Sequence, residues 1–481
     1  MVFNSLEFLL FFPLVVAGYY LIPFRFRWML LLAASYYFYM CWKLEYVFLI
    51  LFSTLVDYVA GIMIEKNRGR RPVMTLWLIF SLVLNLGLLF TFKYFNFFNE
   101  NLRILFNAVN IVWHVPSLNL LLPVGISFYT FQTLSYTIEV YRGNYRAEKH
   151  PGYFALYVSY FPQLVAGPIE RPGNLLPQLR QQHSWTYDNV TDGLKLMAWG
   201  FFKKLVIADR IAVYVDPVFA DPSGYYGLNM LIPAMLLHIR VYCDFSAYSD
   251  IAIGAARIMG VQLSVNFDRP MFATSFRSFW RKWHITLTRF VMDYIFKPLI
   301  SRVNHWGTAG RFFAIVMSFS IIGLWHGAAW GMVLFGFFNG LLVASESVKW
   351  PWQRWMDRFL HPRIVNFLNG VFVFVMICTT VVCFGAGSLP KLSLIYHNIF
   401  SAPLTPLTMQ MFNGDLYSMM VLLLSIALVA IVEFAQKDQP LISGWINRLP
   451  WYGRWLFYLM IITLMFNFGL YSNKAYIYFQ F

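Results

Sequence analysis

The sequence predicts an all-α polytopic membrane protein, and both its composition and its segment pattern support that prediction. Of 481 residues, 59% are hydrophobic and only 12% are charged, whereas charged residues make up about a quarter of a soluble globular protein. The mean hydropathy is positive, and several apolar runs approach the ~20 residues that a membrane helix needs. Too few polar side chains remain to cover a water-exposed surface, which excludes a soluble enzyme, a disordered chain and a collagen-like fibre.

The first hundred residues predict four helices, at about 7–22, 29–42, 45–64 and 73–95. The most basic short loop of the chain, 65–71, lies between the last two. Because Lys and Arg gather in cytoplasmic loops, we expect this loop in the cytoplasm and the N-terminus outside. The same rule explains the net charge of +15 better than nucleic-acid binding does.

The C-terminal part predicts three more helices, at about 364–386, 416–436 and 455–472. The basic segments 349–363 and 437–454 adjoin these helices and are expected in the cytoplasm for the same reason. Phe481 then lies outside, so both termini are predicted to be extracytoplasmic.

Between about 118 and 310, the apolar runs are interrupted by glycine, proline and charge, as in Pro123-Val124-Gly125. Irregular backbone at membrane depth is stable only where protein or a water-filled cavity satisfies its polar groups. We therefore expect re-entrant or tilted helices that line a cavity. The chain is expected to form one integral membrane domain, 1–481, with N-terminal helices at 1–117, a core that carries the chemistry at 118–350 and C-terminal helices at 351–481.

His326 is the only ionisable residue between Arg311 and Glu346. Ionisable groups inside a bilayer are costly, so such a residue is a candidate for function. Gly323 and Gly327, with Gly331 four residues further on, would share one face of a helix, where another backbone or a thin ligand can approach closely. The alternative is a glycine packing face with a hydrogen-bonded histidine, and we favour function.

His284 follows a basic and aromatic stretch that contains Trp280 and Trp283. If the stretch is helical, Trp280 and His284 lie four residues apart on one face, and Arg277 and Arg281 lie four apart as well. This pattern predicts a short interfacial helix. His284 is then either a site residue or part of an anchor made of Trp and Arg.

A third polar group runs from His238 to Asp250 and includes Asp244 and Ser246. Arg240 and Asp244 are spaced for an ion pair within one helix, which would brace the wall of the cavity. His238 fits an ordinary packing role equally well. The motifs of serine hydrolases, P-loop enzymes, dinucleotide-binding enzymes and zinc proteases do not occur. No third ligand accompanies His284 and His326, so no metal is expected.

Several motifs together resemble the membrane-bound O-acyltransferase (MBOAT) family, and most of all its bacterial branch of alginate and peptidoglycan O-acetyltransferases. The likeness runs from residue 1 to about 350. The motifs are Met1–Ser5, Leu122–Tyr129, Val165–Pro168, Asp244–Asp250, Asn266-Phe267, Phe279–His284 and Trp325-His326-Gly327. The D-alanyl transferases of teichoic acid modification are related and share both histidine positions.

The resemblance implies roughly a dozen membrane helices, with re-entrant and interfacial helices, around a central tunnel in the bacterial inner membrane. Members move an acyl group from a cytoplasmic thioester to a hydroxyl, and in this branch the acceptor lies on the far side. The family's catalytic histidine matches His326, and its second polar position matches His284. No bound cofactor is implied, because acetyl-CoA or a phosphopantetheine carrier protein would be the acyl donor and hence a substrate.

The residues support a mechanism that agrees with this resemblance. An apolar site favours the uncharged form of an imidazole, so His326 is ready to accept a proton from the acceptor hydroxyl. His284 would orient the acceptor or stabilise the developing oxyanion. Trp280, Trp283 and Trp325 would exclude water from the thioester, and Asp244, Ser246, Gly323 and Gly327 would complete the tunnel lining.

Two other functions compete with acetyl transfer to a cell-envelope glycan or to a periplasmic acyl-relay partner. The first is transfer of D-alanine from a charged carrier protein. The second is a non-enzymatic transporter or flippase in which His326 relays protons. An acyl-histidine route competes with direct transfer within the enzyme class.

Overall fold

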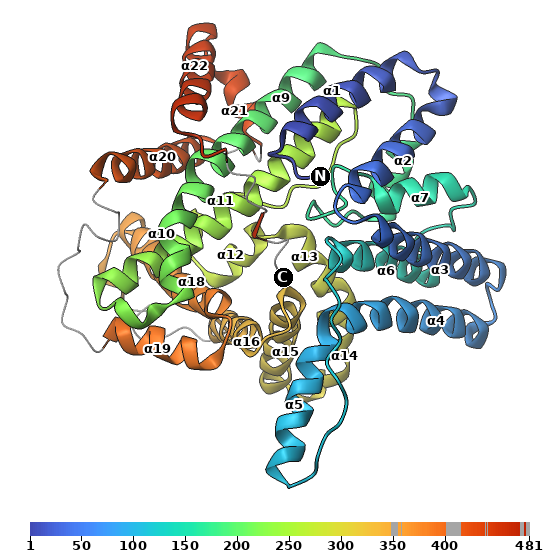
Figure 1. The fold of residues 1–481 in the computed structure, drawn as a ribbon, viewed down its shortest axis with the longest axis horizontal. Coiled ribbons are helices and arrows are strands. Elements are labelled where there is room, and N and C mark those ends of the chain that lie inside the picture. The colour runs from blue at the N-terminus through green and yellow to red at the C-terminus, as the bar shows by residue number, and fades with distance from the viewer. Residues whose placement is uncertain are drawn as a thin grey trace. The chain divides into compact units, whose positions relative to one another are not determined.

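The computed structural model describes residues 1–347, 355–356, 358–400, 415–437, 439, 441–471 and 476–477 (Figure 1). Those residues form helices and connecting segments and contain no β-strand. Six of the described helices are long and apolar enough to cross a membrane. They cover Leu44–Lys66, Arg71–Ala108, Leu228–Ile258, Ile285–His326, Pro362–Ala386 and Leu416–Ala435. The predicted all-α membrane class is thereby confirmed, while a total of about a dozen spans stays a prediction.

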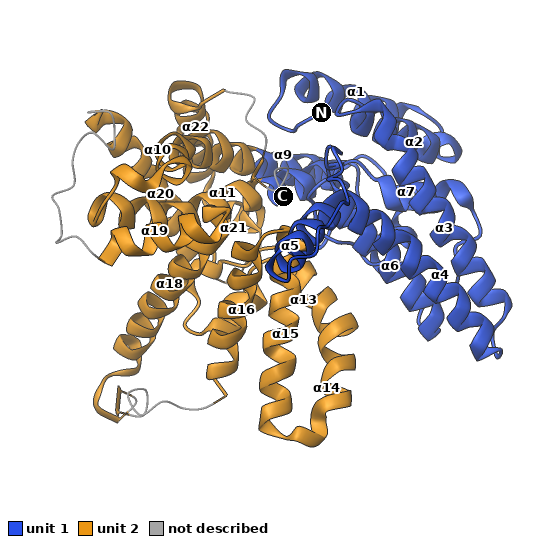
Figure 2. Cartoon of the chain, turned by 60° about the horizontal axis from the view of Figure 1, so that its bottom comes forward, with its two compact units in different colours: residues 1–197, 248–264, 478–480 blue, residues 198–247, 265–477, 481 orange. Residues whose placement is uncertain are grey.

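The chain divides into two compact units, which Figure 2 shows in different colours. Unit 1 comprises 1–197, 248–264 and 478–480, and unit 2 comprises 198–247, 265–477 and 481. The helices of unit 1 are α1 (Leu6–Leu21), α2 (Phe24–Met40), α3 (Val47–Lys66), α4 (Arg71–Leu89), α5 (Phe95–Ala108), α6 (Ile126–Arg142), α7 (Pro151–Ser159), α8 (Pro172–Leu179) and most of α9 (Tyr187–Phe202). The four helices predicted before residue 96 are all present. The second begins five residues earlier than predicted, directly after Pro23, a residue type often found just before or at the first turn of a helix.

The helices α3, α4 and α6 pack together around a buried carboxylate. Asp57 of α3 is fully buried and accepts hydrogen bonds from Ser81 (2.5 Å) and Asn85 (2.8 Å) of α4 and from Thr137 (2.6 Å) of α6. The Ser53 hydroxyl donates to the side-chain oxygen of Asn85. Every oxygen of this carboxylate thus has partners, as a polar group in an apolar bundle requires.

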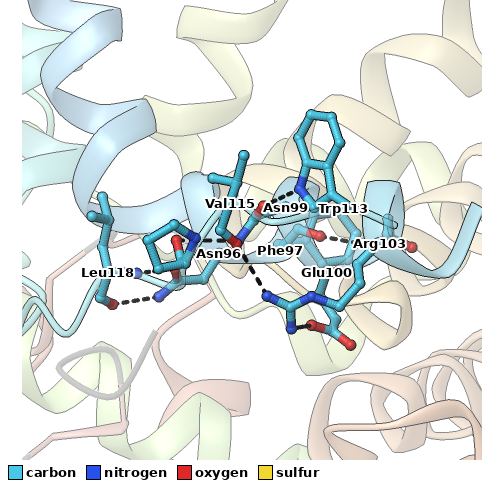
Figure 3. Close-up of polar contacts among 10 residues, drawn as sticks. Asn96, Phe97, Asn99, Glu100, Arg103, Trp113, Val115 and Leu118 are labelled. Carbon is cyan, nitrogen blue, oxygen red and sulfur yellow. Dashed lines mark hydrogen bonds and ion pairs between the residues drawn. The ribbon is translucent and has the colours of Figure 1, made fainter. Parts of the chain in front are cut away.

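A hairpin follows α4 (Figure 3). One π-helical turn, Phe90–Tyr94, connects α4 to α5, and the 38 continuous residues from Arg71 to Ala108 exceed what one perpendicular crossing needs. The segment after α5 turns back and pairs with that helix through side chains. Asn96 exchanges two hydrogen bonds with the backbone of Leu118, at 2.7 and 2.8 Å. Asn99 accepts a hydrogen bond from the Trp113 indole at 2.7 Å.

The irregular middle segments of unit 1 are buried in protein, as expected. Residues 160–170 are buried although they are not helical. Gly125 lies so close to this segment that a Cβ would approach the carbonyl oxygen of Leu164 to 2.8 Å, and its φ of +80° suits glycine. Glu170 accepts hydrogen bonds from Ser264 and from Asn174, at 2.6 Å. Burial nevertheless raises the pKa of Glu170 above its usual value.

Unit 2 contains the remaining helices. They are α10 (Asp209–Ala220), the first part of α11 (Leu228–Ile258), α12 (Phe276–Lys282), α13 (Ile285–Val291), α14 (Lys297–Val303), α15 (Thr308–His326), α16 (Trp330–Ser345), α18 (Pro362–Ala386), α19 (Leu389–Phe400), α20 (Leu416–Ala435), α21 (Ile442–Arg448) and α22 (Trp451–Phe468). The three predicted C-terminal helices correspond to α18, α20 and α22. Residues 349–354 and Phe481, on which part of the orientation argument depends, lie outside the described residues.

The helices α15 and α16 form the tightest pair of unit 2, and glycines permit their contact. A Cβ on Gly323 would lie 2.2 Å from the carbonyl oxygen of Met332, and one on Gly336 would lie 2.2 Å from that of Phe319. The prediction that Gly323, Gly327 and Gly331 share one helical face is wrong. The reason is that α15 ends at His326 and Gly327 is extended, so the chain turns back and the close contact is made between two helices.

Candidate active site

His326 is the last residue of α15 and is buried at 4% exposure. Aromatic rings surround it. The centroids of the Trp325, Phe384 and Phe335 rings lie 4.9, 6.0 and 6.1 Å from that of the imidazole. The helix end places the ring beside the sharp turn into α16, where the side chain is held by packing on three sides.

His284 lies 6.3 Å from His326, measured between ring centroids. It is fully buried, packed edge-on against Phe245 at 4.7 Å and near Trp325 at 5.8 Å. The structure therefore brings together the two histidines that the sequence singled out, 42 positions apart in the chain, and Trp325 contacts both.

The predicted short helix is present as α12, but it does not include His284, so the prediction that Trp280 and His284 share one helical face is wrong. The helix α12 ends at Lys282, and His284 has φ +42° and ψ +56°, in the left-handed region. The physical reason is a competing partner: the N–H of Ile285 donates to the backbone oxygen of Asn266 at 2.9 Å instead of continuing the helix.

The three tryptophans of the candidate site are all buried but occupy different places. Trp325 contacts both histidines, as described. Trp280 packs against Phe319 (5.1 Å) and against Phe335 (6.2 Å), which in turn contacts His326. Trp283 stacks on Phe279 and on His238, so its ring covers the region beside α11.

A cavity of about 290 Å³ lies between α12, α13, α15 and α16. Its lining consists of Arg277, Trp280, Arg281, Thr288, Val291, Met292, Phe296, Arg311, Ile315, Ser318, Phe319, Ile322 and Val343. Along α15 the lining runs from Arg311 to Ile322, one helical turn before His326. Two buried polar atoms belong to lining residues and have no hydrogen-bond partner among the described residues, the indole nitrogen of Trp280 and the hydroxyl of Ser318.

The charged residues that line this cavity are all basic, and one of them, Arg277, also pairs with Glu346 at 3.8 Å. Three arginines line the cavity, and Arg281 and Arg311 are exposed. None of the described lining residues is Asp or Glu. The space thus combines an apolar interior with a cationic border, which suits a chain-like ligand with an anionic end.

Comparison with known proteins identifies the family to which this arrangement belongs. Residues 149–388, which include both histidines, match the membrane-bound O-acyltransferase family, MBOAT. The chain is 35% identical over 403 residues to the probable alginate O-acetylase AlgI of Azotobacter vinelandii. The alignment covers 83% of this chain and 78% of that protein. The chain belongs to the membrane-bound O-acyltransferase family.

Two further relatives show the range of this O-acyltransferase family. The peptidoglycan O-acetyltransferase of Helicobacter pylori is 30% identical over 416 residues, 78% of this chain and 76% of that protein. The teichoic acid D-alanyltransferase of Bacillus subtilis is 25% identical over 279 residues, 55% and 69% of the two chains. The predicted O-acyltransferase class is confirmed, and with it the interpretation of the chain as an enzyme.

Asp244 and Ser246 of this acyltransferase take part in a buried ionic network. The prediction of an ion pair between Arg240 and Asp244 is wrong, because Arg240 pairs with Asp216 while Asp244 pairs with Lys204 at 2.7 Å. Lys204 also contacts Asp209 at 2.9 Å. Removal of one partner of a buried ion pair leaves an uncompensated charge, and the partner of Asp244 lies 40 residues away in the sequence.

Ser246 accepts a hydrogen bond from Lys203 at 2.7 Å. Neither lysine was among the predicted site residues, although two adjacent charges after the apolar residues 196–202 are a clear signal. They lie in the π-helical turn Lys203–Ala208, which joins α9 to α10. Whether Asp244, Ser246, Gly323 and Gly327 face a tunnel stays a prediction.

Proposed function

We propose that this O-acyltransferase moves an acetyl group from a cytoplasmic thioester to a hydroxyl on the far side of the bacterial inner membrane. The acceptor is a cell-envelope glycan or a partner protein that relays the acyl group. One observation carries the proposal: two buried imidazoles face each other one helical turn beyond a cavity with a cationic border. The printed names of the alginate and peptidoglycan relatives support the acetyl group and the class of acceptor.

His326 acts as the general base in this proposal. It accepts the proton of the acceptor hydroxyl while the oxygen attacks the thioester carbonyl carbon. The tetrahedral intermediate collapses with breakage of the C–S bond, and the proton passes from His326 to the departing sulfur, which leaves as a thiol. His284, with its ring centroid 6.3 Å away, donates a hydrogen bond to the carbonyl oxygen as negative charge develops there.

The buried tryptophans keep water away from the thioester. Trp325 packs against both imidazoles, and Trp280 lines the cavity and packs against Phe335, which contacts His326. Exclusion of water prevents hydrolysis of the donor and strengthens the electrostatic interactions inside the site. A route through acyl-His326 would need the same ring, and trapping of a labelled protein in the absence of acceptor would reveal it.

The charges of the cavity favour an acetyl donor over a D-alanyl donor. The phosphates of coenzyme A or of a phosphopantetheine arm are attracted to Arg281 and Arg311. A D-alanyl group carries an ammonium, which needs a carboxylate or several acceptors when it is desolvated, and none of the described lining residues is acidic. Basic residues also favour the cytoplasmic side for this end of the cavity.

The test offers two labelled donors to the purified protein. Acetyl-CoA and a D-alanyl carrier protein, each with a labelled acyl group, are supplied separately with a soluble glycan acceptor, and products are identified by mass. We expect acetyl transfer only, lost in His326→Asn and retained in His305→Asn, which changes an exposed histidine of the 3-10 turn Asn304–Trp306 after α14. Transfer of D-alanine alone would contradict the proposed donor, and undiminished transfer by His326→Asn would contradict the proposed base.

Membrane orientation is part of the same proposal. We propose that both termini are extracytoplasmic and that the loop 65–71 is cytoplasmic. Single cysteines introduced into this loop and next to residue 1, followed by labelling of intact cells with an impermeant thiol reagent, test this orientation. Labelling of the loop, but not of the terminus, would contradict it.

A further inference from the structure

The backbone at His284 is held in an unusual conformation. His284 is one of three non-glycine residues with positive φ among the described residues, at φ +42°. A side chain with a Cβ adopts this conformation only where the surrounding structure stabilises it. The residues that stabilise it therefore help to place the imidazole.

His284 also occupies the N-cap position of α13. The first N–H groups of a helix lack partners within the helix, and the side chain at this position usually accepts one of them. The His284 side chain makes no such hydrogen bond. Another group must therefore satisfy the N–H groups at the start of α13.

Asn266 satisfies them from a distant part of the chain. Its backbone oxygen accepts from the N–H of Ile285 at 2.9 Å. Its side-chain oxygen accepts from the Thr286 hydroxyl at 2.7 Å and from the Thr286 N–H at 3.4 Å. Asn266 is fully buried and Thr286 is 6% exposed, so water does not compete for these bonds.

A further bond fixes the residues before His284. The N–H of Asp268 donates to the backbone oxygen of Lys282 at 3.0 Å, and the ring of Phe267 packs edge-on against Trp283 at 5.3 Å. The segment 266–268 thus holds the chain on both sides of His284. The ring itself is fixed by Phe245, 4.7 Å away.

We propose that Asn266 and Thr286 are positioning residues, which cap α13 in place of His284 and thereby direct its imidazole toward His326. This inference rests on the proposed role of His284 in acyl transfer. It assigns Asn266 a function that its sequence neighbourhood does not reveal, since Asn266 and Thr286 are 20 positions apart.

The experiment compares Thr286→Val with Thr286→Ser in the purified protein. Valine keeps the shape and removes the hydroxyl donor, whereas serine retains the donor. We expect kcat for acetyl transfer to fall about tenfold in Thr286→Val, the equivalent of one hydrogen bond, with KM for the donor changed less than about twofold. Thr286→Ser is expected to restore most of kcat, and Thr379→Val, which removes a hydroxyl bonded within α18, to leave it unchanged.

A double-mutant cycle separates positioning from general stability. Thr286→Val and Asn266→Ala are each combined with His284→Asn. If the pair acts through His284, Thr286→Val has no further effect on kcat once the imidazole is gone, whereas a loss of stability would be additive. An equal tenfold loss in both backgrounds would overturn the inference.

The outcomes also distinguish this inference from the proposed function. Wild-type kcat in Thr286→Val and Asn266→Ala, with a large loss in His284→Asn, would overturn the positioning role and leave the role of His284 intact. Full activity of His284→Asn would overturn the proposed role of His284 itself. If Asn266→Ala fails to fold, Thr286→Val alone still tests the positioning role.

Discussion

Two regions of the molecule bury polar groups among apolar helices, and they do so in opposite ways. Around Asp57 of α3 in unit 1, two helices, α4 and α6, supply donors to both carboxylate oxygens. Beside the cavity in unit 2, the Trp280 indole nitrogen and the Ser318 hydroxyl have no partner among the described residues. A satisfied network holds helices together, whereas a buried polar atom without a partner calls for another explanation, such as a ligand. We expect mutations in the two regions to affect different measurements.

The largest effect is expected at His326. His326→Asn removes the proposed base, so kcat should fall by about 10²–10⁴, while the midpoint of thermal unfolding changes little because the smaller amide fits the same space. Rates of labelled acetyl transfer and thermal unfolding are measured on one preparation. Activity within about twofold of wild type would place the chemistry elsewhere.

Asp57→Ala is expected to lower stability and to leave the catalytic rate unchanged. Removal of this carboxylate leaves the donors Ser81, Asn85 and Thr137 buried without an acceptor, which costs about 1–3 kcal/mol for each group that finds no substitute. The thermal midpoint and the yield should fall, while kcat per folded molecule stays the same. Asp188→Ala, at an exposed position of α9, is the control. A normal thermal midpoint with lost activity would show that Asp57 is a functional residue and would contradict the contrast between the two regions.

Trp280→Phe and Ser318→Ala test the polar atoms beside the cavity of unit 2. Each removes one polar atom beside the cavity, so each should raise KM for the donor about fivefold, the equivalent of about 1 kcal/mol. The loss of the polar atom itself should not lower stability, because neither atom has a hydrogen-bond partner among the described residues. Trp185→Phe, at an exposed tryptophan, should leave KM unchanged. A lower thermal midpoint with normal KM would show that these atoms stabilise the fold and do not contact the donor.

The sequence was sufficient for features that depend on local composition. The apolar runs predicted α3, α18 and α20 to within a few residues, because the length and hydropathy of a membrane helix are set by the bilayer. His326 was identified as the only ionisable residue in its run, which is again a local property. Asp57 carries the same signal within the run 47–64, although it was not among the predicted site residues.

Features that depend on distant partners were not predictable from spacing. The pattern from Arg277 to His284 fits a helix, yet Asn266 takes the N–H that would continue it. Arg240 and Asp244 have ideal helical spacing, yet each has a partner on another segment. Local spacing states which contacts are available within one helix, and the tertiary structure decides which of them form.

The smallest effect is expected at the exposed arginines beside the cavity. Arg281→Gln and Arg311→Gln should each raise KM for acetyl-CoA about two- to threefold at low ionic strength, since exposed charges contribute less than about 1 kcal/mol each. The difference from wild type should shrink as salt increases, because the Debye length falls to about 3 Å at 1 M. Arg281→Lys should retain most of the affinity, and Arg103→Gln, on α5, should change nothing. A KM effect that persists at high salt would mean that these arginines act through their shape or through direct hydrogen bonds. The cavity would then differ from the Asp57 cluster in its contacts and not in its electrostatic field.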